Sequence, residues 1–323
     1  MCSSDLGEDG QLARDPAAQT ARLPSVAFQA ARDALAADAP VLVQVPRRGY
    51  VPSLACADCR TPARCAHCGG PLAASSGHAV PACRWCGRLA GTWRCPACDG
   101  RRFRAVVVGA ARTAEELGRA FPGATLRTSG GAHVLDRVPD GAALVVATPG
   151  AEPYAEKGYG AALLLDGWAL LTRPDLRAAE ETLRRWCAAA AMVRPAAAGG
   201  TVVVGADPGV PAVQALLRWD PVTFATRELA DRTELAFPPA ARFAALTGDP
   251  EAIADLLAAT RLPASAEQLG PVPVEPDQER LLVRVARPDG TALARALHEA
   301  AGVRSARKAP HPVRVQLDPA DLS

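Results

Sequence analysis

The hydrophobic residues of the first two thirds of the chain follow two alternating patterns. Short, uninterrupted apolar runs indicate buried strands, and longer segments with apolar residues three or four positions apart indicate helices. The runs predict strands over residues 41–45, 104–109, 125–127, 142–148, 161–165 and 201–205. The helical spacing covers residues 24–39, 113–121 (with Thr113 as the cap), 176–193 and 210–219. This alternation is typical of an α/β domain built on a mostly parallel, doubly wound sheet.

The pattern changes after the segment Ala236-Phe-Pro-Pro239. Beyond it we expect strands over residues 242–247, near 271–274, over 280–286 and 312–317, and helices over 250–260 and 291–301. This βαββαβ order predicts a small α+β domain of the ferredoxin-like type. The expected organisation is an α/β part over residues 23–53 and 105–234, an inserted cysteine-rich module over 54–104, and the α+β part over 235–323. Residues 1–22 are expected to be a disordered or artefactual N-terminus.

Eight of the ten cysteines lie in the inserted module as four Cys-x-x-Cys pairs. The pairs are Cys56/Cys59, Cys65/Cys68, Cys83/Cys86 and Cys95/Cys98. One such turn directs two thiolates at one ion, and two turns complete a tetrahedral four-sulfur zinc site. Disulfides are less favoured because no signal peptide is visible. A redox function is also less favoured, because a redox motif is a single Cys-x-x-Cys pair and this module has four. We therefore predict two structural Zn²⁺ ions per chain.

The loops between the pairs indicate which pairs share an ion. Five residues separate the first pair from the second, fourteen the second from the third, and eight the third from the fourth. The middle loop resembles that of a zinc ribbon, in which two knuckles close a loop of roughly 15–20 residues. We thus expect an inner site of Cys65, Cys68, Cys83 and Cys86 and an outer site of Cys56, Cys59, Cys95 and Cys98. Gly69, Gly87 and Asp99-Gly100 follow the second cysteines, where the turn needs a positive φ.

The charge of the chain limits how tightly it is expected to bind nucleic acid. The formal net charge is only +2, but the stretch from Cys56 to Arg104 carries eight arginines and two aspartates. Two zinc tetrathiolate centres would subtract about four charges from this local +6. Modest DNA binding through phosphate contacts is expected from Arg47, Arg48, Arg101, Arg102 and Arg104, with ordinary surface charge as the alternative. For Trp85 and Trp93, packing in the module's core is favoured over base stacking.

With these residues in view, the chain resembles the C-terminal half of the replication-restart primosomal protein PriA family (primosomal protein N′). The most specific match is Arg47-Arg48-Gly49-Tyr50 leading into the eight cysteines. Further matches, which extend the resemblance from about Leu23 to Leu322, are Arg173-Pro-Asp-Leu-Arg-Ala-Ala-Glu180, Val213-Gln-Ala-Leu-Leu217, Phe237-Pro-Pro239 and Val315-Gln-Leu-Asp-Pro319. The resemblance implies the second RecA-like lobe of a superfamily-2 DNA helicase, with an inserted zinc module and a small C-terminal domain.

The resemblance also implies a function and partners. Members of the family recognise abandoned replication forks and help to reload the replicative helicase, so branched DNA, primosome components and single-stranded-DNA-binding protein are the implied partners. No stretch reaches the roughly 18 apolar residues of a membrane span. We expect a cytoplasmic, nucleoid-associated monomer.

The chain departs from the family pattern at the residues that would bind and hydrolyse ATP. Neither of the two lysines, Lys157 and Lys308, follows a glycine, so the chain has no P-loop and the first lobe is expected to be missing. The positions of the family's arginine fingers fall on Met192 and Pro195. We therefore predict no catalytic residue and a helicase-inactive member of the type found in high-GC, actinobacterial-like bacteria. Two alternatives stay open: an active ATP-dependent 3′–5′ helicase whose first lobe is supplied separately, and a zinc-stabilised protein-interaction module without a role on DNA.

Overall fold

The computed structural model describes residues 23–46, 53–59, 61–74, 79–106, 109–173, 175–275, 277–320 and 322. The chain forms two compact units, and the division falls between Pro221 and Val222. The first unit contains a parallel sheet and the cysteine module, and the second contains an antiparallel sheet.

Five strands form the parallel sheet of the first unit. They are β1 (Val41–Gln44), β6 (Thr125–Ser129), β8 (Ala143–Ala147), β10 (Ala161–Leu164) and β11 (Thr201–Val204). Their spatial order is β11-β10-β1-β8-β6, and every neighbouring pair is parallel. Every residue of β1, β8 and β10 is buried, because helices cover both faces of a sheet of this kind. The predicted parallel α/β sheet is confirmed.

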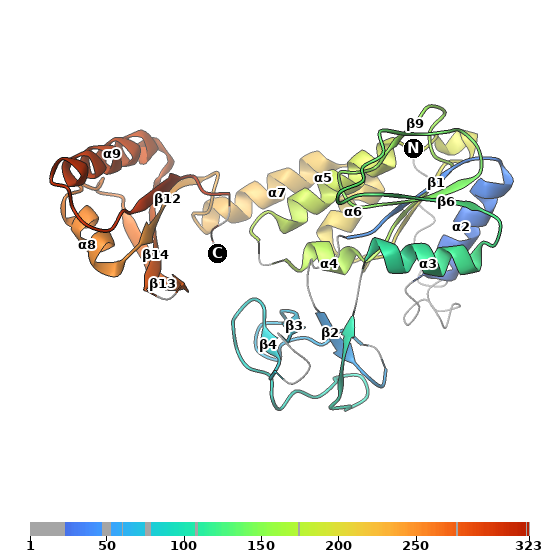
Figure 1. The fold of residues 1–323 in the computed structure, drawn as a ribbon, viewed down its shortest axis with the longest axis horizontal. Helices are drawn as coiled ribbons and strands as arrows, with labels where there is room; N and C mark the ends of the chain where they lie inside the picture. The colour runs from blue at the N-terminus through green and yellow to red at the C-terminus, as the bar shows by residue number, and fades with distance from the viewer. Residues whose placement is uncertain are drawn as a thin grey trace. The chain divides into compact units, whose positions relative to one another are not determined.

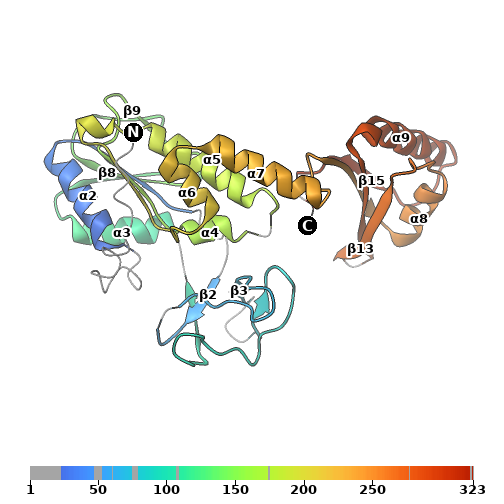
Figure 2. The same ribbon diagram turned by 180° about the vertical axis from the view of Figure 1, so that it is seen from behind.

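Helices pack on each face of this sheet (Figure 1). On one face α2 (Ser25–Ala36) and α3 (Ala110–Ala120) bury small apolar residues against the strands, in a core that includes Val43, Leu144 and Leu163. On the other face lie α5 (Ala178–Ala191) and α6 (Pro211–Arg218), as both views show (Figure 2). The short helix α4 (Gly167–Leu171) connects β10 to α5.

One predicted strand does not join the parallel sheet. Residues 104–109 were expected there, but β5 (Phe103–Val106) pairs antiparallel with β2 (Ser53–Cys56). The two strands form a stalk at the base of the cysteine module, with Cys56 opposite Phe103. An apolar run predicts a strand but not its partner, and here the partner is the other end of the same insertion.

The predicted cap of α3 is also wrong. The helix begins at Ala110 after Gly109, one turn earlier than expected. Thr113 is fully buried, and its hydroxyl donates to the Gly109 carbonyl at 3.1 Å. Threonine can make this backward bond within a helix as well as cap one, so the presence of Thr113 alone does not decide between the two roles.

The remaining elements of the first unit are short. β3 (Leu72–Ala73) and β4 (Ala82–Cys83) pair within the cysteine module. β7 (Arg137–Val138) and β9 (Tyr154–Ala155) form a small parallel pair, and η1 (Ala196–Ala198) precedes β11.

The helix α7 (Pro221–Glu234), which belongs to the second unit from Val222 onward, was not predicted by the hydrophobic pattern. The elements that follow are β12 (Ala241–Gly248), α8 (Pro250–Ala258), β13 (Glu267–Glu275), β14 (Gln278–Ala286), η2 (Arg287–Asp289), α9 (Gly290–Ala306) and β15 (Arg314–Leu317). The sheet order is β13-β14-β12-β15, and all pairs are antiparallel. The predicted βαββαβ order is therefore present.

The core of the second unit lies between its sheet and its helices. Leu246 on β12 and Val283 on β14 pack with Leu256 of α8 and Leu297 of α9. The aromatic rings of Phe237, which follows α7, and Phe243 on β12 stack with centroids 6.4 Å apart. In the described part of the chain, no helix is both long and apolar enough to cross a membrane.

Candidate metal centres and nucleic-acid interface

Each Cys-x-x-Cys pair forms the same tight hairpin. The backbone N–H of the first cysteine donates to the carbonyl five residues later in all four hairpins: Cys56 to Thr61, Cys65 to Gly70, Cys83 to Arg88 and Cys95 to Gly100, at 2.8–2.9 Å. The residue after the second cysteine is left-handed at Gly69, Gly87 and Asp99, with φ of 71°, 70° and 56°. The predicted positive φ is thus present, and at the fourth pair Asp99 adopts it.

The structure brings the eight cysteines together as two groups of four. Cys56, Cys59, Cys95 and Cys98 form one group and Cys65, Cys68, Cys83 and Cys86 the other, and the sulfur atoms of each group all lie within 4.8 Å of one another. The two groups have the membership of the nested arrangement expected from the loop lengths. That the groups bind zinc stays a prediction.

The sulfur distances fit a tetrahedral zinc ion. Zn–S bonds of about 2.3 Å at tetrahedral angles place neighbouring sulfurs about 3.8 Å apart. In the outer group Cys56 and Cys98 are 3.5 Å apart and Cys59 and Cys95 are 3.4 Å apart. In the inner group the Cys65–Cys86 distance is 3.8 Å and the Cys68–Cys83 distance is 3.4 Å. A zinc ion at each group would cross-link two hairpins of a module that has little core of its own.

Hydrogen bonds favour the thiolate form of one cysteine in each group. The Thr61 hydroxyl, 3.2 Å from the sulfur, lowers the pKa of Cys59 to about 6. The backbone N–H groups of Cys68 and His67 lower the pKa of Cys65 to about 7. Since only the thiolate binds a metal, each group has one ligand that is readily ionised near neutral pH. His67 is exposed and contributes through its backbone, so the imidazole is not needed for the site.

A small apolar cluster supports the two groups. Trp93 is only 9% exposed, its indole N–H donates to the Arg64 carbonyl at 3.0 Å, and its ring lies 4.7 Å from that of Phe103. The cluster also includes Leu54 and Leu72. Trp93 therefore packs in the core as predicted. Trp85 does not, because half of its side chain is exposed.

The predicted DNA-contacting arginines have different surroundings. Arg47 and Arg48 lie outside the described residues. Arg101, Arg102 and Arg104 are exposed at the start of β5 and just before it. Arg102 pairs with Asp58 at 2.5 Å, which partly neutralises its charge. The other aspartate of the module, Asp99, pairs with Arg94 at 2.7 Å.

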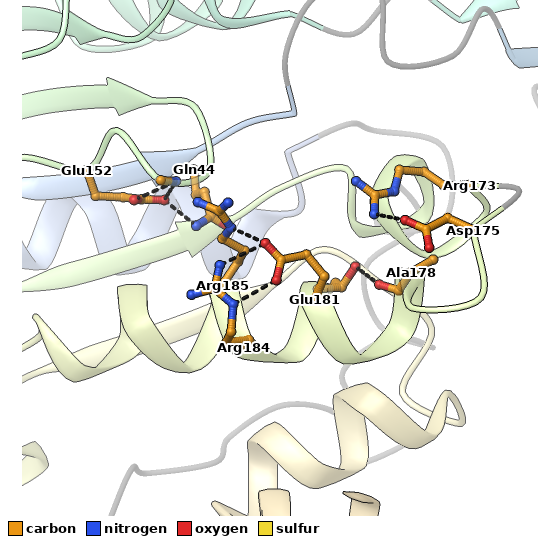
Figure 3. Close-up of polar contacts among 10 residues, drawn as sticks. Gln44, Glu152, Arg173, Asp175, Ala178, Glu181, Arg184 and Arg185 are labelled. Carbon is orange, nitrogen blue, oxygen red and sulfur yellow. Dashed lines mark hydrogen bonds and ion pairs between the residues drawn. The ribbon is translucent and has the colours of Figure 1, made fainter. Parts of the chain in front are cut away.

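A polar cluster that was not predicted lies at the carboxyl ends of β1 and β8. The buried side chain of Gln44 donates to Glu152 at 2.6 Å, and Glu152 also accepts from the Gly150 backbone N–H at 2.8 Å (Figure 3). The Arg185 guanidinium lies against Gly150, where a Cβ would be only 1.8 Å from it. The one signal in the sequence was Gln44 itself, the polar residue of an otherwise apolar strand.

Glu181 of α5 holds two arginines beside this cluster. It accepts two hydrogen bonds from Arg184, at 2.7 and 2.8 Å, and one from Arg185 at 2.6 Å (Figure 3). These hydrogen bonds lower the pKa of Glu181 to about 2, and those from Arg184 contribute most to the shift. Both arginine side chains are therefore held by a carboxylate of their own helix.

The two expected finger positions carry no cation. Met192 is the C-cap of α5, and Pro195 precedes η1. The nearby Arg194 donates to the Lys157 carbonyl at 3.0 Å. Asp166, the residue before α4, is buried and left-handed with a φ of 53°.

Comparisons with known proteins identify the family of the chain. Residues 233–320 match the family model "Primosomal protein N C-terminal domain". The chain is 55% identical, over 98% of its length, to "Probable replication restart protein PriA" of Mycobacterium tuberculosis and to that of Mycobacterium bovis. The chain belongs to the PriA family. The Mycobacterium leprae PriA is 56% identical over 94% of the chain. The chain spans about half the length of these curated PriA relatives, 51% of the first two and 49% of the third.

Proposed function

We propose that this chain acts in replication restart: it binds stalled or abandoned forks and promotes primosome assembly and reloading of the replicative helicase, without helicase activity of its own. The observation that carries the proposal is the 55% identity over 98% of the chain to proteins named for replication restart. In this proposal, the parallel-sheet unit corresponds to a second RecA-like lobe and residues 233–320 to the small C-terminal domain.

Two Zn²⁺ ions are part of the proposed function. The two groups of four sulfurs have distances that suit tetrahedral coordination, and each group joins hairpins from different parts of the module. The ions would hold the arginines of the module in fixed positions for contact with phosphates. Structural zinc supplies folding energy to small modules of this kind.

The absence of helicase activity is proposed for residues 1–323 by themselves. These residues contain no P-loop lysine, and the positions expected for arginine fingers hold Met192 and Pro195. An arginine finger contributes about 10³–10⁵ in rate. Nearby, Arg184 and Arg185 are engaged by Glu181.

A binding assay on zinc-loaded protein tests the proposal. A forked DNA and a linear duplex of equal length and base composition are compared at several salt concentrations. We expect tighter binding to the fork and a linear fall of log K with log salt. Equal affinity for both DNAs would contradict fork recognition. No binding to either would favour the rival function, a zinc-stabilised protein-interaction module.

A further inference from the structure

Trp85 is placed unusually for a tryptophan in a small metal-binding module. It lies between the two cysteines of the third pair, and 50% of its side chain is exposed. One side of the indole is anchored: its N–H donates to the Thr172 carbonyl at 3.3 Å. The ring also lies against Gly70, where a Cβ would come within 2.9 Å of two ring carbons. Trp85 is thus held in one position while much of the ring is in contact with solvent.

The same hairpin exposes two cations and two further apolar side chains. Arg84, which precedes Trp85 inside the knuckle, and Arg88, two residues after Cys86, are both exposed. Ala82 pairs with Leu89, so Val80 and Leu89 lie on one face of the hairpin, and they are 54% and 73% exposed. Val80 and Leu89 thus add exposed apolar side chains to the hairpin that carries Trp85.

The charge of this surface favours an anionic partner. No Asp or Glu occurs between Cys59 and Cys98. The two aspartates of the module lie at its other end, and both are paired with arginines. Within the module, the segment that carries Trp85 therefore has positive side chains and no carboxylate of its own to compete with a phosphate.

We propose that Trp85, Arg84 and Arg88 form a binding platform for single-stranded nucleic acid; the inference rests on the proposed role on DNA. A base stacks on the exposed part of the Trp85 ring, and the two arginines contact the flanking phosphates. Proteins that bind single strands without sequence preference combine these two features, since every base has a flat face. The aromatic ring is fixed before binding, which lowers the entropy lost when a base stacks on it.

The test compares variants of the full chain for binding to a 20-nucleotide oligo-dT. Trp85→Ala is expected to weaken binding about five-fold to 150-fold, the range that loss of one stacked base produces. Trp85→Phe keeps an aromatic face and is expected to retain most of the affinity. Trp219→Ala is the matched control, because Trp219 is 49% exposed and lies outside the module. Two zinc ions per chain in each variant show that the module is folded.

Several outcomes would overturn the platform. One is unchanged oligo-dT affinity in Trp85→Ala, and another is an equal loss in Trp219→Ala. Polyglutamate is tested as a competitor. If it competes as strongly as oligo-dT does, and if this competition depends on Trp85, the surface is a site for acidic peptides instead. Fork binding is measured in parallel. If forks bind and Trp85→Ala changes nothing, the platform alone fails; if neither DNA binds, the proposed function fails with it.

Discussion

At the scale of single residues, small side chains and charge pairs decide the geometry of the two candidate sites. Gly100 has no Cβ, and one built there would lie 2.5 Å from an Asp58 oxygen and 3.1 Å from the Cys56 sulfur. A glycine at this position thus lets the fourth hairpin lie close to the first without displacing the Asp58 side chain or the Cys56 sulfur. Around α5, Glu181 orders Arg184 and Arg185 through hydrogen bonds assisted by charge.

The grouping of the cysteines leads to the first prediction. Cys65→Ser removes one of four sulfurs from the inner group and leaves the outer group intact. Zinc content is expected to fall from two ions to one per chain, as measured by metal analysis of the purified protein. Cys187→Ser, outside both groups, is the control and should keep two ions. Loss of the outer ion with retention of the inner one would show that the assignment is wrong.

Glu181 leads to a prediction on pH. Its folded-state pKa is about 2, below the ordinary value of a free glutamate. Its stabilising effect is therefore fully present above about pH 4.3 and is lost as pH falls towards 2. Since about a third of the side chain is exposed, with a relative exposure of 34%, solvent screening keeps this effect to about 0.5–1 kcal/mol.

Urea unfolding of Glu181→Gln measures this effect. The variant is expected to be less stable than the wild type at pH 7, and the difference should vanish near pH 2. Glu115→Gln on α3 is the control, because the ion pair of Glu115 with Arg119, at 3.6 Å, is exposed. A difference that persists unchanged to pH 2 would mean that Glu181 acts by packing and not by charge.

At the scale of elements, the stalk of β2 and β5 determines where the arginines of the module lie. The antiparallel pairing of Cys56 with Phe103 joins the first hairpin to the segment after the fourth. Arg101, Arg102 and Arg104 are carried by this segment and by β5, and all three are exposed. Their positions depend on the outer sulfur group, because Cys56 belongs both to that group and to β2.

These arginines give a prediction about DNA. Replacing Arg101, Arg102 and Arg104 together with glutamine is expected to weaken binding to forks and linear duplexes alike, because phosphate contacts carry no base information. The slope of log K against log salt should decrease by roughly one for each phosphate that is no longer neutralised by an arginine. The control replaces Arg112 and Arg119 on α3, which pair with Glu116 and Glu115. An unchanged slope in the triple variant would identify the three arginines as ordinary surface charge.

At the scale of the whole molecule, the candidate metal centres and the domain matched by the family model lie in different units. The first unit carries the parallel sheet and the cysteine module, and the second carries the domain that matches the primosomal family model. The carboxyl ends of parallel strands are where ligands bind in doubly wound sheets. Here β1 and β8 end at a cluster in which Gln44 and Glu152 bond to each other.

Residues 1–323 are accordingly expected to hydrolyse no ATP, with or without single-stranded or forked DNA. The physical reason is the lack of a lysine that cradles the β- and γ-phosphates and of an arginine at either finger position. Phosphate release by zinc-loaded protein is compared with that of a zinc-stripped sample and of buffer. Hydrolysis that rises with DNA and exceeds both controls would contradict the prediction.

Much of the structure of this protein follows from patterns in its sequence. The alternating strands and helices follow from hydrophobic spacing, which depends on residues close together in the chain, and the grouping of the eight cysteines follows from the lengths of the loops between their pairs. The tertiary structure decided what depends on distant residues. The partner of β5 lies about 50 residues away in β2, Gln44 meets Glu152 across 108 positions, and Trp85 is held by Thr172. No local pattern encodes these contacts, because each arises only when the sheet and the module bring separate segments together.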